Sequence, residues 1–322
     1  MILFTVTLNP ALDYSISLPD FSRGAIQWFS QSGFAPGGKG VNVSLLLTSL
    51  GVENRALGIA AGFTGREIVR RLEEKGCQTE FVLLDQGTSR VNVKLQTAGG
   101  EETAFNGEGP EIPAQAVDEL LEKLSALSGE DVLVLSGSLP KGLPETAFPQ
   151  LLEAARRPGA RLVVDMSGDS LLAALPYHPF FIKPNEEELC QLFGVEGPLT
   201  VQEAKGYAQE LQRLGARNVV VSMGAKGALL LEEEGRCLFC HGVRGAAVST
   251  VGAGDSLVAG FLYGWRLHGT AEGGLRWGVA AGSATAFRQG IATGEEVKGL
   301  FPQVDVYERQ GPGWSRRWRP GW

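Results

Sequence analysis

Between residues 113 and 224 the chain alternates wholly apolar runs with amphipathic stretches, and this alternation restricts the fold more than any other feature. "DVLVLSG" at 131–137, "RLVVDMSG" at 161–168 and "NVVVSMG" at 218–224 are rich in Val and Leu, and helical patterns lie between them. Strands without a polar face are typical of parallel sheets that helices cover on both sides. The sequence therefore predicts an α/β fold of three layers, with a central, mostly parallel sheet between helices.

Small or polar residues end these runs. They are Ser136, Asp165, Lys183 and Ser222. In open α/β sheets, ligands bind in the crevice beyond the carboxyl ends of the strands. We therefore expect the binding site at this edge of the sheet.

Two segments near 10–40 and 79–106 carry short strand patterns. "LDYSISL" at 12–18 alternates apolar and polar residues, and the second segment contains "TEFVLL", "RVNVKLQ" and "ETAFN" between turn residues. We expect these strands to form a small sheet, a β lid, within one domain over 1–310. Residues 311–322 show no helical or strand period and are predicted to be a tail, disordered or artificial.

The overall composition argues against two classes of partner. A net charge of -7 and a pI near 5.2 do not suit duplex nucleic acid, which requires a concentrated basic face. The sequence also lacks the roughly 18 apolar residues in a row that cross a bilayer, and the first residues lack a basic leader. We expect a cytoplasmic protein that binds neither nucleic acid nor membrane.

"STVGAGDS" at 249–256 is the strongest candidate site. A β-branched run enters a Gly-Ala-Gly turn, and an apolar helix follows, so the amides of Gly252, Ala253, Gly254 and Asp255 should converge at a helix N-terminus. Such a point suits a phosphoryl group in transfer. Asp255 is either a helix cap or a proton acceptor, and the helix dipole should lower its pKa.

"GFAPGGKG" at 33–40 resembles a P-loop through Gly38 and Lys39. The eighth position is Gly40, which lacks the hydroxyl that a P-loop uses to hold magnesium. The pattern alone therefore does not say which phosphate this loop would bind.

Three further stretches have both a structural and a functional interpretation. In "IKPNEEEL" at 182–189, the structural interpretation is a helix capping box, because Asn185 and Glu188 have that spacing. The functional interpretation is that a carboxylate here helps to order hydrated magnesium. "VSMGAKGALL" at 221–230 is structurally a hairpin turn, and functionally its glycines would let a base or a phosphate approach the backbone closely. "SGSLPKG" at 136–142 offers hydroxyls and amides, while Arg90 taken alone is a solvated cation.

In their order along the chain, these motifs resemble those of the ribokinase-like sugar kinases, the phosphofructokinase B group. The resemblance covers nearly all of residues 1–305 and rests on TLNPALD, PGGKGVNV, SGSLPKG, IKPNEEEL, VSMGAKGA and STVGAGDS. Gly-Ala-Gly-Asp is highly specific for the family, and TSRVNVKL with TLNPALD brings the chain closest to its 1-phosphofructokinase branch. The resemblance implies a ribokinase-like fold with a small β-sheet lid.

The resemblance also implies roles for individual residues. Asp255 would accept a proton, with the amides of Gly252, Ala253 and Gly254 on the transferring phosphoryl group. The implied substrate-binding residues are Asp13, Gly37, Gly38, Lys39, Asn42, Arg90 and Ser138. The implied nucleotide-binding residues are Lys183, Asn185, Ser222, Met223, Gly224, Ala225, Lys226, Gly227 and Gly254. Glu188 would hold magnesium through water.

The implied reaction is ATP-dependent phosphorylation of fructose 1-phosphate at its C6 hydroxyl, with Mg²⁺ and with K⁺ as a candidate activator. The substrate class is a phosphorylated ketohexose, and the expected assembly is a homodimer. A tagatose-6-phosphate kinase has nearly the same motifs and is an alternative. A non-catalytic sugar-phosphate sensor is an alternative of another class.

Overall fold

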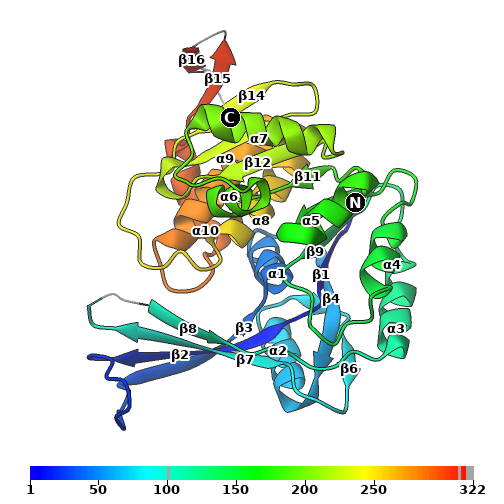
Figure 1. Cartoon of the computed structure of the whole chain (residues 1–322), viewed down its shortest axis with the longest axis vertical. Helices are drawn as coiled ribbons and strands as arrows, with labels where there is room; N and C mark the ends of the chain where they lie inside the picture. The colour runs from blue at the N-terminus through cyan, green and yellow to red at the C-terminus, as the bar shows by residue number, and fades with distance from the viewer. Residues whose placement is uncertain (100–101, 311–312, 317–322) are drawn as a thin grey trace.

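The computed structural model describes residues 1–99, 102–310 and 313–316, in which a large sheet and a small sheet are packed with helices (Figure 1). The large sheet contains twelve of the described strands. In spatial order they are β16 (Gly313–Arg316), β15 (Val306–Gln310), β14 (Cys237–Cys240), β13 (Ala228–Leu231), β12 (Asn218–Ser222), β11 (Phe181–Ile182), β10 (Arg161–Asp165), β9 (Val132–Ser136), β1 (Leu3–Thr7), β4 (Asn54–Ala61) and β5 (Gln78–Thr79), with β6 (Val82–Leu84) also on β4.

The middle of this sheet is parallel, as the apolar runs predicted. Strands β4, β1, β9, β10, β11 and β12 pair in parallel, and β13 to β16 continue antiparallel at one edge. All five residues of β9 are buried, because helices cover both of its faces. The predicted α/β fold with a mostly parallel central sheet is confirmed.

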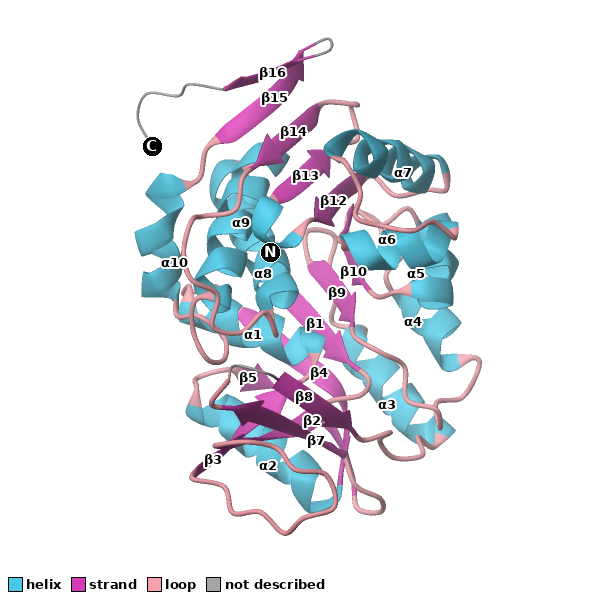
Figure 2. Ribbon diagram, turned by 60° about the vertical axis from the view of Figure 1, so that its left-hand side comes forward, coloured by secondary structure: helices cyan, strands magenta, loops and turns pink. Residues whose placement is uncertain are grey.

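Two groups of helices form the outer layers (Figure 2). One face of the sheet carries α3 (Ala114–Leu124), α4 (Ala147–Ala154), α5 (Gly168–Ala174), α6 (Glu186–Phe193) and α7 (Val201–Arg213). The other carries α1 (Lys39–Ser49), α8 (Ala253–His268), α9 (Ala271–Ala286) and α10 (Gly294–Leu300). Short 3₁₀ turns lie at η1 (Leu175–Tyr177), η2 (Gly224–Lys226) and η3 (Phe301–Gln303). Within the described ranges, no helix is both long and apolar enough to cross a membrane.

The small sheet, which we call the lid sheet, consists of β3 (Gln31–Gly37), β2 (Ala11–Leu18), β7 (Arg90–Thr97) and β8 (Glu102–Asn106) in that order. Helix α2 (Gly62–Glu74) packs between it and β4. Only three residues separate the end of β1 from the start of β2, so the lid sheet begins at the carboxyl edge of the large sheet.

The lid sheet has two chemically different faces. Asp13 pairs with Asn92 in the register of β2 and β7, and Lys94 follows on the same face because side chains alternate along a strand. Tyr14 and Phe34 stack on the opposite face with ring centroids 4.4 Å apart. The polar face carries Asp13 and Arg90, which the sequence predicted for ligand binding.

Two predictions about chain segments are corrected. "TEFVLL" at 79–84 does not join the lid sheet, because β5 and β6 pair with β4 of the large sheet. Residues 313–316 of the predicted tail form β16, which pairs with β15; the ring of Trp314 lies 5.9 Å from that of Phe239. This aromatic contact on an edge strand was missed because the segment is short and has no period of its own. Residues 311–312 and 317–322 of that tail lie outside the described residues.

Helices α8 and α9 pack with their backbones in contact. A methyl group at Gly260 would lie 2.5 Å from the Trp277 carbonyl oxygen and 2.6 Å from the Ala281 Cβ. Since the nearest atom belongs to backbone, a side chain at this position would push the helices apart.

We expect Gly260→Ala to lower the free energy of unfolding by about 1–3 kcal/mol, because the added carbon overpacks this contact. Gly206→Ala in α7 is the matched control, since nothing lies within 4 Å of its added carbon. The control should be neutral or stabilised by up to about 1 kcal/mol, because alanine has the higher helix propensity. Urea unfolding of the two variants checks this, and equal stability would contradict the packing argument.

Candidate active site

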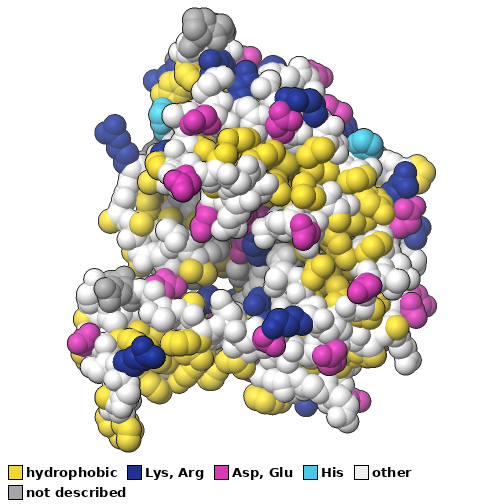
Figure 3. Space-filling view, in the orientation of Figure 1, with side chains coloured by type: hydrophobic (Ala, Val, Ile, Leu, Met, Phe, Trp, Pro, Cys, Tyr) yellow, Lys and Arg dark blue, Asp and Glu magenta, His cyan; other side chains and the backbone are white. Residues whose placement is uncertain are grey.

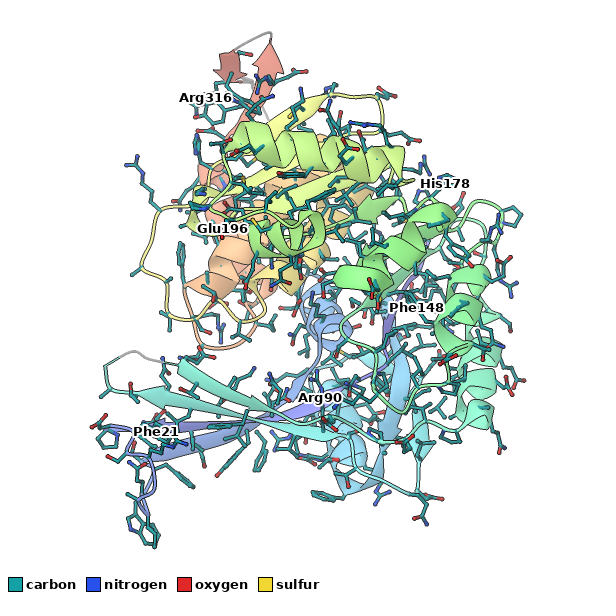
Figure 4. All side chains as sticks on the ribbon, viewed as in Figure 1. Phe21, Arg90, Phe148, His178, Glu196 and Arg316 are labelled. Carbon is teal, nitrogen blue, oxygen red and sulfur yellow. The ribbon has the colours of Figure 1, made fainter. Side chains whose placement is uncertain are left out.

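A hollow with Lys and Arg side chains separates the lid sheet from the body of the molecule (Figure 3). Figure 4 places Arg90 where the lid sheet joins the body, at one side of this hollow. The predicted site residues come from four directions: the lid sheet, the start of α1, the carboxyl ends of β9, β11 and β12, and the start of α8.

The start of α8 is fixed from two sides. Gly252 is its N-cap with a φ of 81°, a left-handed conformation that favours glycine. The hydroxyls of Ser256 and Thr285 are 2.7 Å apart and join α8 to α9. The Ala253 N–H donates to the Thr250 carbonyl at 3.2 Å, so the prediction of a free amide there is wrong for this structure. The amides of Gly254 and Asp255 lie in the first helical turn, which has no partner within the helix.

Asp255 is buried, and the Asn42 side-chain amide donates to its Oδ2 at 2.7 Å. Burial and the nearby Asp165 carboxylate raise its pKa to about 6, although Asn42, Lys39 and Lys183 act in the opposite direction. The helix dipole alone predicted a lowered pKa. That expectation is wrong, because desolvation and a like charge from a distant strand outweigh it.

Asp165 lies beneath this group at the end of β10. It is 1% exposed, and its Oδ1 lies 3.3 Å from the Lys39 Nζ and 3.4 Å from the Lys183 Nζ. Burial opposes ionisation, but the two ammonium groups hold the pKa of Asp165 below its usual range. The sequence showed Asp165 only as a polar strand end and gave it no role in the site.

Lys39 connects several members of the site. Its Nζ lies 3.6 Å from the Glu188 Oε1 in addition to its contact with Asp165. Burial lowers the pKa of Lys39, but Asp165, Glu188 and Asp255 outweigh burial and raise it above the ordinary value. Lys39 therefore stays protonated.

Asn185 and Glu188 form the capping box that their spacing predicted. The Glu188 N–H donates to Asn185 Oδ1 at 2.7 Å, and the Asn185 N–H donates to Glu188 Oε2 at 2.9 Å. The structural interpretation is therefore confirmed. Glu188 Oε1 faces Lys39, so the same residue also belongs to the site.

Asp13 is held on the polar face of the lid sheet. Its Oδ1 accepts from Asn92 at 2.8 Å and its Oδ2 from Lys94 at 2.6 Å. A methyl group at Gly37 would lie 2.5 Å from that Oδ2, so the position leaves no room for a side chain. Asn92 and Lys94 were not predicted to belong to the site, although their spacing of two on a predicted strand was the available signal.

Arg90 and Ser138 lie at the two sides of Asn9. The Arg90 Nε donates to the Asn9 carbonyl at 3.1 Å, and burial lowers the pKa of Arg90 although Asp13 raises it. The Asn9 amide lies 3.5 Å from the Ser138 hydroxyl, which is on an exposed residue. Arg90 is thus a half-buried cation of the site rather than a fully solvated one.

The segment from Ser222 to Gly227 follows β12 and turns through η2. Ser222 forms a bridge with Asn185, which brings this turn beside the capping box. The Lys226 ammonium donates to Glu186 at 2.8 Å and to the Leu199 carbonyl at 3.2 Å. Met223 is 2% exposed, and its N–H donates to the Gly227 carbonyl at 2.8 Å, so this residue packs in the core beneath the turn.

Comparisons with known proteins agree with this geometry. The model of the pfkB family carbohydrate kinases matches residues 10–298. The 1-phosphofructokinase of Bacillus subtilis (strain 168) is 42% identical over 304 residues, 94% of this chain and 99% of that protein. A D-tagatose-1-phosphate kinase of Bacillus licheniformis is 34% identical, over 94% of this chain and 99% of that protein.

The fold has a solved counterpart. The crystal structure of phosphofructokinase-2 from Escherichia coli in complex with substrates and products has a TM-score of 0.88 and 30% sequence identity to this chain. The match covers 94% of this chain and 99% of that one. The ribokinase-like fold is therefore confirmed.

We expect the Asp255 carboxylate to destabilise the folded state at neutral pH. Its folded pKa is raised to about 6, above the ordinary value of 3.8, so between these values the folded state binds a proton that the unfolded state has released. Stability therefore falls as pH rises through this window and is then level. Asp255→Asn should unfold at higher urea than the parent at pH 7, by an amount on the order of 1–3 kcal/mol that shrinks towards pH 4. A difference that stays constant over pH 4–7 would contradict the raised pKa.

Proposed function

The chain belongs to the pfkB family of carbohydrate kinases, and on that premise we propose that it transfers the γ-phosphoryl group of ATP to the C6 hydroxyl of fructose 1-phosphate, giving fructose 1,6-bisphosphate. Membership of the family makes the protein a sugar kinase, a phosphotransferase with an alcohol acceptor. The similarity that supports the choice of acceptor is the 42% identity to a 1-phosphofructokinase over 94% of the chain.

Asp255 is the proposed proton acceptor. A carboxylate whose pKa is raised to about 6 is a stronger base than an ordinary aspartate and is still mostly ionised at pH 7. Asn42 holds one of its oxygens, which leaves the other oxygen for the incoming hydroxyl. Asp255 takes the hydroxyl proton as the new oxygen–phosphorus bond forms and the bond to the ADP oxygen breaks.

The first turn of α8 is the proposed site of the transferring phosphoryl group. The amides of Gly254 and Asp255 point along the helix dipole, and the Lys183 Nζ lies 3.2 Å from the position of a Cβ on Gly254. Gly252 and Ala253 shape this turn. Backbone amides and an ammonium group together stabilise the charge that develops on the phosphoryl oxygens.

The lid sheet and the start of α1 supply the proposed acceptor site. Asp13 is oriented to accept hydrogen bonds from sugar hydroxyls, and Arg90 is suited to the phosphate already on the sugar. The remaining proposed contacts are Gly37, Gly38, Lys39, Asn42 and Ser138. The cations here would offset the net charge of -7 of the whole chain in this one place.

The nucleotide is proposed to lie on the opposite side of the hollow. Its proposed contacts are Lys183, Asn185, Gly254 and the turn Ser222, Met223, Gly224, Ala225, Lys226 and Gly227. Glu188 Oε1 is a suitable ligand for hydrated Mg²⁺, which keeps several waters and takes few protein groups, and the ion would neutralise the phosphates. Activation by K⁺ stays a prediction. Dependence on ATP favours a cytoplasmic location.

Two other functions follow from specific observations. The relative named D-tagatose-1-phosphate kinase, at 34% identity, makes a tagatose phosphate the second candidate acceptor. Tagatose 6-phosphate, the alternative from the sequence, is tested alongside it. A non-catalytic sensor would have the same pocket without turnover, and the buried Asp255 argues against it.

The lid sheet suggests how two copies would associate. Its outer face exposes Phe34 at 46% and Phe105 at 54%, and Trp28, in the loop before β3, is 87% exposed. Yellow atoms mark this underside in Figure 3. Four strands with one apolar face need a partner for that face, and a second copy offers an identical one. We therefore propose a homodimer through the lid sheets.

The acceptor is tested by an ADP-release assay with fructose 1-phosphate, tagatose 1-phosphate, tagatose 6-phosphate and fructose 6-phosphate side by side. Fructose 1-phosphate should give the highest kcat/KM. A higher value for any of the others would refute this acceptor.

Asp255→Asn should lose about 10³-fold or more in kcat, while calorimetry should show that it still binds the sugar phosphate. Turnover at the parent rate would refute the role of Asp255 as base.

The dimer is tested by light scattering at micromolar concentration. Phe105→Asp should give a monomer, because a charge in the centre of an apolar interface is costly to desolvate. Leu214→Asp is the control, since Leu214 is 52% exposed at the C-cap of α7, which packs on the large sheet. A monomeric parent, or a dimeric Phe105→Asp variant, would contradict the proposed interface.

A further inference from the structure

Asp165 is the most deeply buried charged group of the active site, and no step of the proposed reaction uses it. It is 1% exposed at the end of β10, in register with Ser136 on β9. One carboxylate oxygen, Oδ1, contacts the ammonium groups of Lys39 and Lys183 at 3.3 Å and 3.4 Å. The other, Oδ2, is buried without a hydrogen-bond partner in the described part of the chain. A buried carboxylate that contacts two lysines through one oxygen holds their ammonium groups close to each other.

The two lysines come from separate parts of the fold. Lys39 begins α1, beside the lid sheet, and its ammonium group also faces Glu188 at 3.6 Å. Lys183 follows β11 and is 4% exposed, with its ammonium group against Gly254 in the first turn of α8. Asp165 thus joins a cation on the acceptor side to a cation on the side of the transferring group.

Without an anion between them, these cations would not stay together. Two ammonium groups that contact the same oxygen lie within about 7 Å of each other, and at that separation like charges repel strongly where water is scarce. The Lys39 side chain is 33% exposed and is free to move towards solvent, whereas the Lys183 side chain is enclosed. The separation of the two cations therefore depends on the carboxylate.

We propose that Asp165 is a positioning residue for phosphoryl transfer, which does not touch the substrate but holds Lys39 and Lys183 at a fixed separation on either side of the transferring group. This inference rests on the proposed function. Asp165 also faces Asp255, whose pKa its charge helps to raise, while Lys39 and Lys183 oppose that effect and Asn42 holds the carboxylate. One buried anion would then set both the position of the cations and the strength of the base.

The proposal predicts a separation of catalysis from binding in Asp165→Asn. We expect kcat to fall by about 10²-fold, because two preorganised cations lose their geometry. We expect MgADP and inorganic phosphate to bind as tightly as to the parent or more tightly, since the lysines no longer contact a protein anion. The acid limb of the kcat/KM profile should move to lower pH, because a like charge beside Asp255 is gone. A purely structural role would instead weaken binding and leave the pH profile in place.

Asp131 provides the matched control. It is also buried, at 4% exposure, but it precedes β9 and so lies at the amino ends of the strands, away from the site. Its oxygens accept hydrogen bonds from the Ile2 N–H at 2.7 Å and from Ser128. Asp131→Asn should lower the urea midpoint and leave kcat within about twofold of the parent. A loss of kcat in Asp131→Asn as large as that in Asp165→Asn would overturn the proposal.

A double variant covers the case in which Asp165→Asn folds poorly. Asp165→Asn combined with Lys183→Met removes both halves of one buried pair and leaves no uncompensated charge there. If Asp165 acts by holding Lys183, its substitution should cost much less in the Lys183→Met background than in the parent. Additive losses, or an unchanged kcat in Asp165→Asn, would refute the positioning role.

These measurements are independent of the acceptor's identity. They use whichever phosphosugar the parent phosphorylates best, and the binding measurements with MgADP and phosphate need no acceptor. A preference for another sugar would therefore refute the proposed acceptor without affecting the test of Asp165.

Discussion

The active site depends on placing opposite charges together in a region from which the fold excludes water. Asp165 and Asp255 are both buried, and Lys183 is 4% exposed, so none of them could remain ionised alone. The parallel sheet meets this requirement, because Asp165 and Lys183 end strands that lie side by side. The start of α8 then brings Asp255 to the same place. The raised pKa of Asp255 is therefore a product of the architecture as much as of the local motif.

The layers of the fold could be predicted from the sequence, but the ends and edges of the sheets could not. The Val and Leu runs identified β9, β10 and β12, because a strand buried on both faces has a composition that few other structures share. The assignment of 79–84 to the lid was wrong, since short strands with mixed composition suit either sheet and only tertiary pairing with β4 decides between them. The strand at 313–316 was missed for a related reason, because a short edge strand is selected by its neighbour β15 rather than by a pattern of its own.

The local backbone structure of the candidate site could be predicted from the sequence, but the contacts that its side chains make across the fold could not. The turn before Asp255 and the capping box of Asn185 are local, so spacing alone indicated them. Asp165 gave no comparable signal, because its partners are 126 residues away at Lys39 and on the neighbouring strand at Lys183. The pKa of Asp255 was predicted in the wrong direction for the same reason: the helix dipole is visible in sequence, whereas desolvation is not.

The alternation of side chains along the lid strands links the proposed substrate site to the proposed dimer interface. Asp13 and Tyr14 are consecutive, so one faces the hollow and the other stacks with Phe34 on the outer face. A shift of one residue in the register of β2 would exchange the two faces and place aromatic rings in the site. The hydrogen bonds of Asp13 to Asn92 and Lys94 oppose such a shift from within. An apolar partner on the outer face would oppose it from outside, so dimer formation would also fix the residues that we propose bind the sugar.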